Sequence, residues 1–104
     1  MRQALVHYNG RIAGTIRETT EGFEFQYDTH YLAGGIPISF NYPLQEDAFY
    51  YAEFPNFFEN LVAEGWMRKL QSQEQHIDEA DPFGLLLANG RDLTGAVTIT
   101  ALSE

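Results

Sequence analysis

The side chains of this protein that could carry out chemistry are three histidines and many carboxylates. His7, His30 and His76 are too widely spaced for a metal-binding motif, and the sequence has no cysteine to complete one. The acidic pairs Glu46-Asp47 and Asp78-Glu79 fall in polar segments, where solvated loop positions are expected. A phosphate-binding loop with its lysine is also absent. We therefore predict no catalytic residues, no metal site and no cofactor, and expect that the protein is not an enzyme.

Trp66, the one tryptophan, is the side chain best suited to binding another molecule. Tryptophan is enriched among the residues that dominate the binding energy of interfaces, but it is also common in protein cores. Gly65 before it suits a left-handed helix end, and Arg68 and Lys69 follow within one helical turn. The sequence alone leaves two positions open for Trp66, one in the core and one at an interface.

We predict that a corner between two helices, residues 63–69, is the partner-binding site, with Trp66 as its main anchor. Glu64 precedes this corner and could pair with a basic group of the partner. The residues assigned to the site are Glu59, Ala63, Glu64, Gly65, Trp66, Met67 and Arg68.

The helices around this corner are predicted from hydrophobic spacing and from end signals. Apolar residues at i, i+1, i+4 and i+5 between positions 57 and 62 predict a first helix, with Pro55 in its opening turn and Gly65 as its stop. A second helix is expected over about 66–75. A third is expected to begin at the N-cap Asp81, with proline next to it, and to end at 89–90. The second helix has four apolar positions: Trp66, Met67, Leu70 and Ile77.

Five segments are expected to be β-strands, namely 3–8, 11–17, 23–27, 38–42 and 95–101. The Asn9-Gly10 dipeptide predicts a hairpin, and residues 23–27 alternate between apolar and polar. The aromatic residues 49–51 could cover one end of the sheet or form an exposed patch. We predict a single α+β domain over residues 1–104, with a small antiparallel or mixed sheet of about five strands and about three short helices.

The chain carries a formal charge of −9, from 15 Asp and Glu residues against 6 Lys and Arg residues. The basic residues are scattered, so direct binding to nucleic acid or to an anionic membrane surface is not expected. No apolar run approaches the roughly 18 residues of a membrane span. The lack of cysteine fits a reducing cytoplasm, and we expect a cytoplasmic protein. The acidic surface could face a basic partner or could serve solubility alone.

Two motifs and the first hairpin are similar to those of one known family. FFENLVAEGWMRKL, residues 57–70, resembles the FFxNLLPEG signature of the N-terminal domain of HipA-type serine/threonine kinases. DPFGLLLANGRDLTGAV, residues 81–97, resembles the DPFALLxxxGxDxxGAV segment of the same domain, and LVHYNGRIAGTIRE resembles its first hairpin. The resemblance runs from about residue 5 to about residue 100.

Two departures from the family pattern bear on function. Ala63 stands where the family usually has proline, so a softer break between the two helices is expected. The sequence ends at Glu104, where HipA proteins continue into ATP-binding and catalytic lobes, so we expect that this chain is not a kinase. A stand-alone domain of this kind resembles the small HipS antitoxins of HipBST toxin–antitoxin operons.

This resemblance implies an antitoxin that binds and inhibits a HipT-like serine/threonine kinase toxin. It also implies a HipB-like DNA-binding protein in the same complex, so that this chain would reach DNA only indirectly. Inhibition could proceed by insertion of a side chain from the 63–69 corner into the kinase cleft, or by docking that holds the kinase inactive. The alternatives are a non-inhibitory scaffold or activating subunit that links the kinase to the DNA-bound repressor, and a HipA gene fragment without function.

Overall fold

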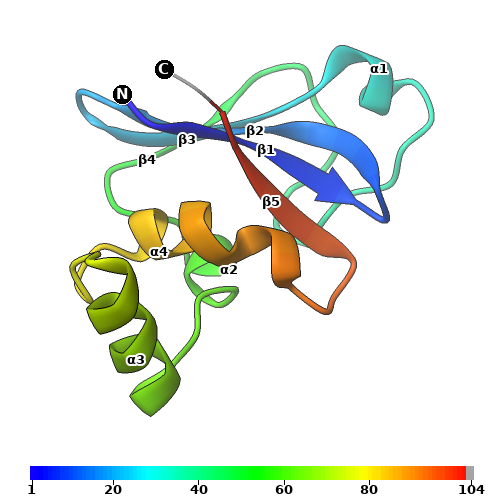
Figure 1. Cartoon of the computed structure of the whole chain (residues 1–104). Helices are drawn as coiled ribbons and strands as arrows, with labels where there is room; N and C mark the ends of the chain where they lie inside the picture. Colours follow the sequence, from blue (N-terminus) through cyan, green and yellow to red (C-terminus); the bar gives the residue numbers. More distant parts are fainter. Residues whose placement is uncertain (103–104) are drawn as a thin grey trace.

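The computed structural model describes residues 1–102, and within them a five-stranded antiparallel sheet forms the centre of the molecule (Figure 1). The strands are β1 (Gln3–Tyr8), β2 (Arg11–Thr19), β3 (Gly22–Tyr27), β4 (Phe49–Tyr51) and β5 (Val97–Leu102). Their spatial order is β4-β3-β2-β1-β5, and every neighbouring pair is antiparallel. β1 therefore lies between its hairpin partner β2 and the last strand, β5.

Four α-helices and one short 3-10 helix complete the structure of residues 1–102. They are α1 (Thr29–Leu32), α2 (Asn56–Glu59), α3 (Gly65–Gln75), α4 (Pro82–Asn89) and η1 (Gly90–Asp92). In Figure 1, α2 and α4 lie against one face of the sheet, whereas α3 extends away from it. The predicted α+β class is confirmed, with four α-helices in place of about three.

The first three strands form an antiparallel meander that includes the hairpin predicted from Asn9-Gly10. Asn9 (φ 50°) and Gly10 (φ 83°) both have positive φ, as a two-residue hairpin turn of this kind requires. On β3, Phe25 and Tyr27 are buried, whereas Gln26 between them is partly exposed. This alternation gives the sheet one covered face and one open face.

The strand predicted at 38–42 is wrong. Ile38 and Tyr42 are buried, but the segment between them turns, and the Tyr42 N–H donates to the Ser39 carbonyl at 3.0 Å. The hydroxyl of Tyr27 fixes both ends of the segment, because it accepts from the Ile38 N–H at 3.0 Å and donates to the Tyr42 carbonyl. A buried tyrosine hydroxyl needs such partners, and here it obtains them from a loop and not from a strand.

The fourth strand is β4, from the aromatic segment whose position the sequence left open. Phe49 pairs with Phe25 of β3, and Tyr51 pairs with Phe23. Phe49 and Tyr51 pack on the core, whereas Tyr50 between them is 74% exposed. Aromatic side chains suit such a half-buried pleated edge.

The helix predicted to end at Gly65 is much shorter. α2 has four residues, with Pro55 as its N-cap residue and Asn60 as its C-cap residue. The chain then tightens, because the Val62 N–H donates to the carbonyl three residues earlier (3.1 Å) and the Val62 side chain is buried. Gly65 has the expected left-handed backbone (φ 59°), but it is the first residue of α3 and does not end α2.

α4 begins as predicted and supplies the helical side of the core. The Asp81 carboxylate accepts a hydrogen bond from the Gly84 N–H at 3.1 Å, and Pro82 occupies the first helical position. The buried side chains of this helix are Phe83, Leu85 and Leu86. Gly90, which follows it, lies so close to β5 that an added Cβ would stand 2.5 Å from the Cβ of Ile99. Direct contact with β5 thus fixes the end of α4.

Arg2 ties the start of β1 to the start of α4. Its guanidinium donates to Glu18 and to Asp81, each at 2.7 Å, and lies 5.3 Å from the centre of the Phe83 ring. The hydrogen bond from Arg2 lowers the pKa of the Glu18 carboxyl. Burial raises the pKa of Asp81, but hydrogen bonds from Arg2 and from the Gly84 N–H, with the Arg2 charge, lower it further than burial raises it. Asp81 therefore caps α4 and pairs with the Arg2 guanidinium at the same time.

The depressed pKa values of Glu18 and Asp81 predict how the stability of the domain depends on pH. Unfolded carboxyls titrate near pH 4, so the contribution of this cluster is fully present above about pH 5. It is lost as the pH falls through the lower pKa values of the folded state. We expect Arg2→Met to lower the free energy of unfolding by about 1 kcal/mol at pH 7. The difference from the natural sequence should shrink below about pH 4.

Urea unfolding at a series of pH values measures this effect. Arg91→Met is the matched control, because Arg91 is exposed on η1 and its loss changes the net charge by the same amount. The Arg91→Met protein should follow the natural protein at every pH. A difference in the free energy of unfolding between Arg2→Met and the natural protein that stays constant down to pH 2 would contradict the role given to this cluster.

α3 ends on a residue that strains its backbone. His76 is the C-cap residue and has φ 56° and ψ 44°, a left-handed conformation that costs non-glycine residues energy. We expect His76→Gly to stabilise α3 by about 1 kcal/mol. Gln73→Gly, inside the same helix, should instead destabilise α3 by about 1 kcal/mol. Hydrogen exchange of the α3 amides measures both changes, and faster exchange in His76→Gly would refute this assignment.

Candidate functional site

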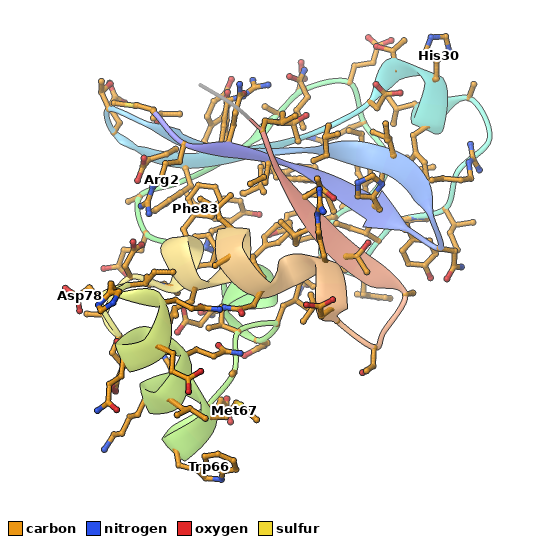
Figure 2. All side chains as sticks on the ribbon, in the orientation of Figure 1. Arg2, His30, Trp66, Met67, Asp78 and Phe83 are labelled. Carbon is orange, nitrogen blue, oxygen red and sulfur yellow. The ribbon has the colours of Figure 1, made fainter. Side chains whose placement is uncertain are left out.

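The side chain of Trp66 lies in solvent, at the end of α3 farthest from the sheet (Figure 2). Trp66 is 72% exposed, Met67 is 42% exposed and Leu70 is 39% exposed. None of the eleven residues of α3 is buried. The core position that the sequence left open for Trp66 is therefore excluded in this chain.

Trp66, Met67 and Leu70 form one apolar face of α3. Leu70 lies four residues after Trp66 and three after Met67, the two spacings that make side chains neighbours on a helix, and Trp66 and Met67 are labelled together at the tip of α3 in Figure 2. Leu70 was predicted as an apolar helix position but not as a site residue. Its spacing of four from Trp66 is the sequence signal that places it with the site.

Gly65 gives α3 an open start. Glu64 is the N-cap residue with an extended backbone (φ −121°, ψ 165°), and its side chain makes no capping hydrogen bond. The left-handed backbone of Gly65 favours glycine, and a Cβ added there would meet no atom within 4 Å. The backbone just before Trp66 is thus uncovered, and the Glu64 carboxylate is exposed beside it.

Arg68 holds α3 in place. Its guanidinium donates to the Glu79 carbonyl through Nε (2.9 Å) and Nη2 (2.7 Å), and Nη1 donates to the Glu59 carboxylate at 3.3 Å. The Arg68 side chain is only 19% exposed as a result. Of the residues assigned to partner binding, Glu59 and Arg68 thus contact each other and join α3 to α2 and to the turn before α4. The neighbouring Lys69 is exposed.

The other end of α3 is attached to α4. The side-chain amides of Gln75 and Asn89 exchange two hydrogen bonds, of 2.8 and 2.9 Å. Ser72 donates from its hydroxyl to the carbonyl of Ile77, and this closes the turn after the helix. Polar contacts at both ends therefore position α3, and its apolar face stays outside the core.

Ala63 lines a cleft between residues 61–63, α3 and α4. The volume of this cleft is about 240 Å³, and its apolar wall includes Leu61, Val62, Leu85 and Leu93. The site residues predicted from the sequence thus divide into two groups. Glu64, Gly65, Trp66 and Met67 are exposed at the tip of α3, whereas Glu59, Ala63 and Arg68 are partly buried.

The acidic residues near α3 also divide into two kinds. Glu64, Glu74, Asp78 and Glu79 are exposed, whereas Asp81 is engaged by Arg2 and by the first turn of α4. Residues 1–102 contain no group of three or more His, Cys, Asp or Glu side chains arranged to hold a metal ion. None of the helices in this part of the chain has the length and apolar character needed to cross a membrane. The described surface at the tip of α3 thus combines exposed apolar side chains with the exposed carboxylate of Glu64.

Comparisons with known proteins agree with this fold along the whole chain. A family model, the HipA N-terminal domain, matches residues 4–100. An uncharacterized protein of Haemophilus influenzae is 37% identical over 99 residues, which cover 95% of this chain and 92% of that protein.

Two solved structures share the fold. The N-terminal domain of a HipA toxin superposes with a TM-score of 0.79 and 32% identity, over 100% of this chain and 95% of that one. A complex of HipA and HipB with operator DNA from Shewanella oneidensis gives a TM-score of 0.72 at 19% identity. The match covers 93% of this chain but only 23% of the Shewanella chain, and at this identity it shows the fold alone. The chain belongs to the HipA N-terminal domain family.

Proposed function

We propose that this protein is an antitoxin that binds and inhibits a HipT-like serine/threonine kinase toxin through the tip of α3. The observation that carries the proposal is that Trp66 is 72% exposed. It lies on α3, a helix with no buried residue, so packing of the core does not explain an apolar side chain there. A large exposed aromatic side chain with apolar neighbours is the usual anchor of a protein interface. The structural relatives come from toxin–antitoxin proteins, and this supports a kinase of the same kind as the partner.

The mechanism we favour is insertion of Trp66 into the kinase cleft. The uncovered backbone at Gly65 lets a partner surface approach the tryptophan from the start of the helix. The exposed Glu64 carboxylate can pair with a basic group at the cleft, where the kinase must attract phosphate. Met67 and Leu70 enlarge the apolar contact around the ring. A HipB-like repressor would then join through the kinase, with this chain remote from DNA.

The first test removes the anchor. Trp66→Ala should abolish rescue of growth when the protein is co-expressed with a HipT-like kinase, because loss of a buried interface anchor costs roughly 2–4 kcal/mol, or about 30- to 1,000-fold in affinity. The thermal unfolding midpoint of the free domain should not change, since Trp66 makes no core contact.

Phe40→Ala is the matched control, because Phe40 is fully exposed on a different segment and its loss also removes an exposed aromatic ring. Phe40→Ala should rescue growth as the natural protein does. A Trp66→Ala protein that folds and still neutralises the toxin would exclude insertion and favour docking that holds the kinase inactive. If the natural protein gives no rescue, the chain is a non-inhibitory scaffold or a gene fragment without function, and if it increases toxicity, it is an activating subunit.

The second test concerns the position of α3. We expect Arg68→Gln to weaken neutralisation by about tenfold, because the partner must then order a loosened helix at a cost of about 1.4 kcal/mol. Lys69→Gln, the adjacent residue with the same change of charge, should have little effect. The α3 amides should exchange faster in Arg68→Gln only. Equal losses of neutralisation in the two variants would show that the positive charge, and not the contact of Arg68 with Glu79, is needed for neutralisation.

A further inference from the structure

A second surface of the domain, remote from α3, combines exposed carboxylates with aromatic grooves. The sequence has no lysine or arginine between Arg17 and Arg68. Some acidic residues of this stretch, such as Glu24, are engaged by an arginine in an ion pair. Four others are exposed at the two ends of the edge strand β4, and no ion pair joins them to a cation among residues 1–102: Glu21, Glu46, Asp47 and Glu53.

Two grooves meet at the end of β4. One has a volume of about 540 Å³ and lies between the end of β4 and the start of α2, with Glu53 on its rim. The other has a volume of about 410 Å³ and lies between β4 and the β2–β3 turn, with Glu21 on its rim. Tyr51 and Ala52 line both grooves, so one bound segment could occupy the two together.

Each groove pairs one carboxylate with aromatic walls. The groove of Glu53 is walled by Tyr42, Phe54 and Phe57. The groove of Glu21 is walled by Phe23 and by Tyr50, whose ring is 74% exposed. A guanidinium group stacks on aromatic faces and binds carboxylates through two parallel hydrogen bonds, so it satisfies both features at once. The ammonium of lysine matches the charge but lacks the planar stacking surface.

We propose that this surface, the β4 rim (residues 19–23 and 49–57), is a second protein-binding site that takes a segment with two arginine side chains, one in each groove. Glu46 and Asp47 extend the negative charge along the strand, and a hydrogen bond from Gln26 to the Glu46 carbonyl (3.0 Å) holds that part of the loop beside β3. Charge excludes nucleic acids and anionic lipids from this site. β4 has only three residues, so side chains and not backbone strand addition carry the contact.

The β4 rim is separate from the tip of α3. β4 lies at the edge of the sheet in Figure 1, whereas Trp66 lies at the far end of α3 in Figure 2. The domain could therefore bind an arginine-bearing partner and a kinase at the same time. This inference does not depend on the antitoxin assignment, because it rests on different residues.

The test uses a fluorescein-labelled octa-arginine peptide and the full chain, with binding measured by fluorescence anisotropy. Glu21→Gln/Glu53→Gln should weaken binding by about fivefold or more, because each groove loses its carboxylate. The matched control is Glu74→Gln/Asp78→Asn, which removes the same charge from exposed positions on α3 and after it. The control should change the affinity by less than about twofold. Octalysine should bind the natural protein at least about threefold more weakly than octa-arginine.

Backbone amide shifts in a ¹H–¹⁵N titration with octa-arginine locate the peptide. Shifts confined to residues 19–23 and 49–57 support the proposal. Equal weakening by the two double variants, equal affinity for octalysine, or shifts spread over all exposed acids would each overturn it, since they would mean general attraction to an acidic protein. Circular dichroism of each variant confirms that the exposed substitutions leave the fold intact.

Discussion

Coverage of one face of the five-stranded sheet is the constraint on which the rest of this structure depends. α2 and α4 supply Phe58, Phe83, Leu85 and Leu86 to this cover, and the segments between the elements add Ile38, Tyr42 and Val62. The centre of the Phe25 ring on β3 lies 5.7 Å from the ring centre of Phe58 and 5.3 Å from that of Tyr42. The core is therefore filled without any side chain from α3. Once this face is covered, α3 has no core to join, and its apolar residues remain in solvent. The exposed apolar side chains of α3 are therefore left over from core packing, and neighbouring side chains of this kind are typical of an interaction surface.

The way α3 is attached bears on how it could act. Three of its residues make polar contacts that hold it: Arg68 with Glu79 and Glu59, Gln75 with Asn89, and Ser72 with Ile77. Contacts of this kind fix the direction of a helix with little burial of apolar surface. A projecting helix that is already ordered loses less conformational entropy on binding than a flexible one. The domain thus holds Trp66 in a fixed position before any partner binds.

Local sequence patterns correctly predicted the turns, strands and helix caps that are determined by neighbouring residues. The Asn9-Gly10 turn, the alternation in β3, and the Asp81 cap followed by Pro82 are all present as expected. The misassigned strand at 38–42 depends on a distant tyrosine hydroxyl, which no local pattern encodes. The exposure of Trp66 is also a tertiary outcome, because it follows from α2 and α4 already filling the core. For the same reason the sequence could propose Arg68 as a site residue but could not reveal its contact with the Glu79 carbonyl.

The place of β1 in the sheet determines when the domain can complete itself during synthesis. β1 is the second strand from one edge, and its outer neighbour β5 comes from residues 97–102. In a nascent chain that lacks β5, Ala4 and Val6 of β1 have no outer strand to pair with. Gly90 also lacks its close contact with Ile99 of β5. Pairing the first strand with the last gives high contact order, and such pairing forms late. Because Gly90 packs on β5 and Gln75 of α3 bonds to Asn89 of α4, the attachment of α3 to α4 reaches its final geometry only after residues 97–102 have emerged.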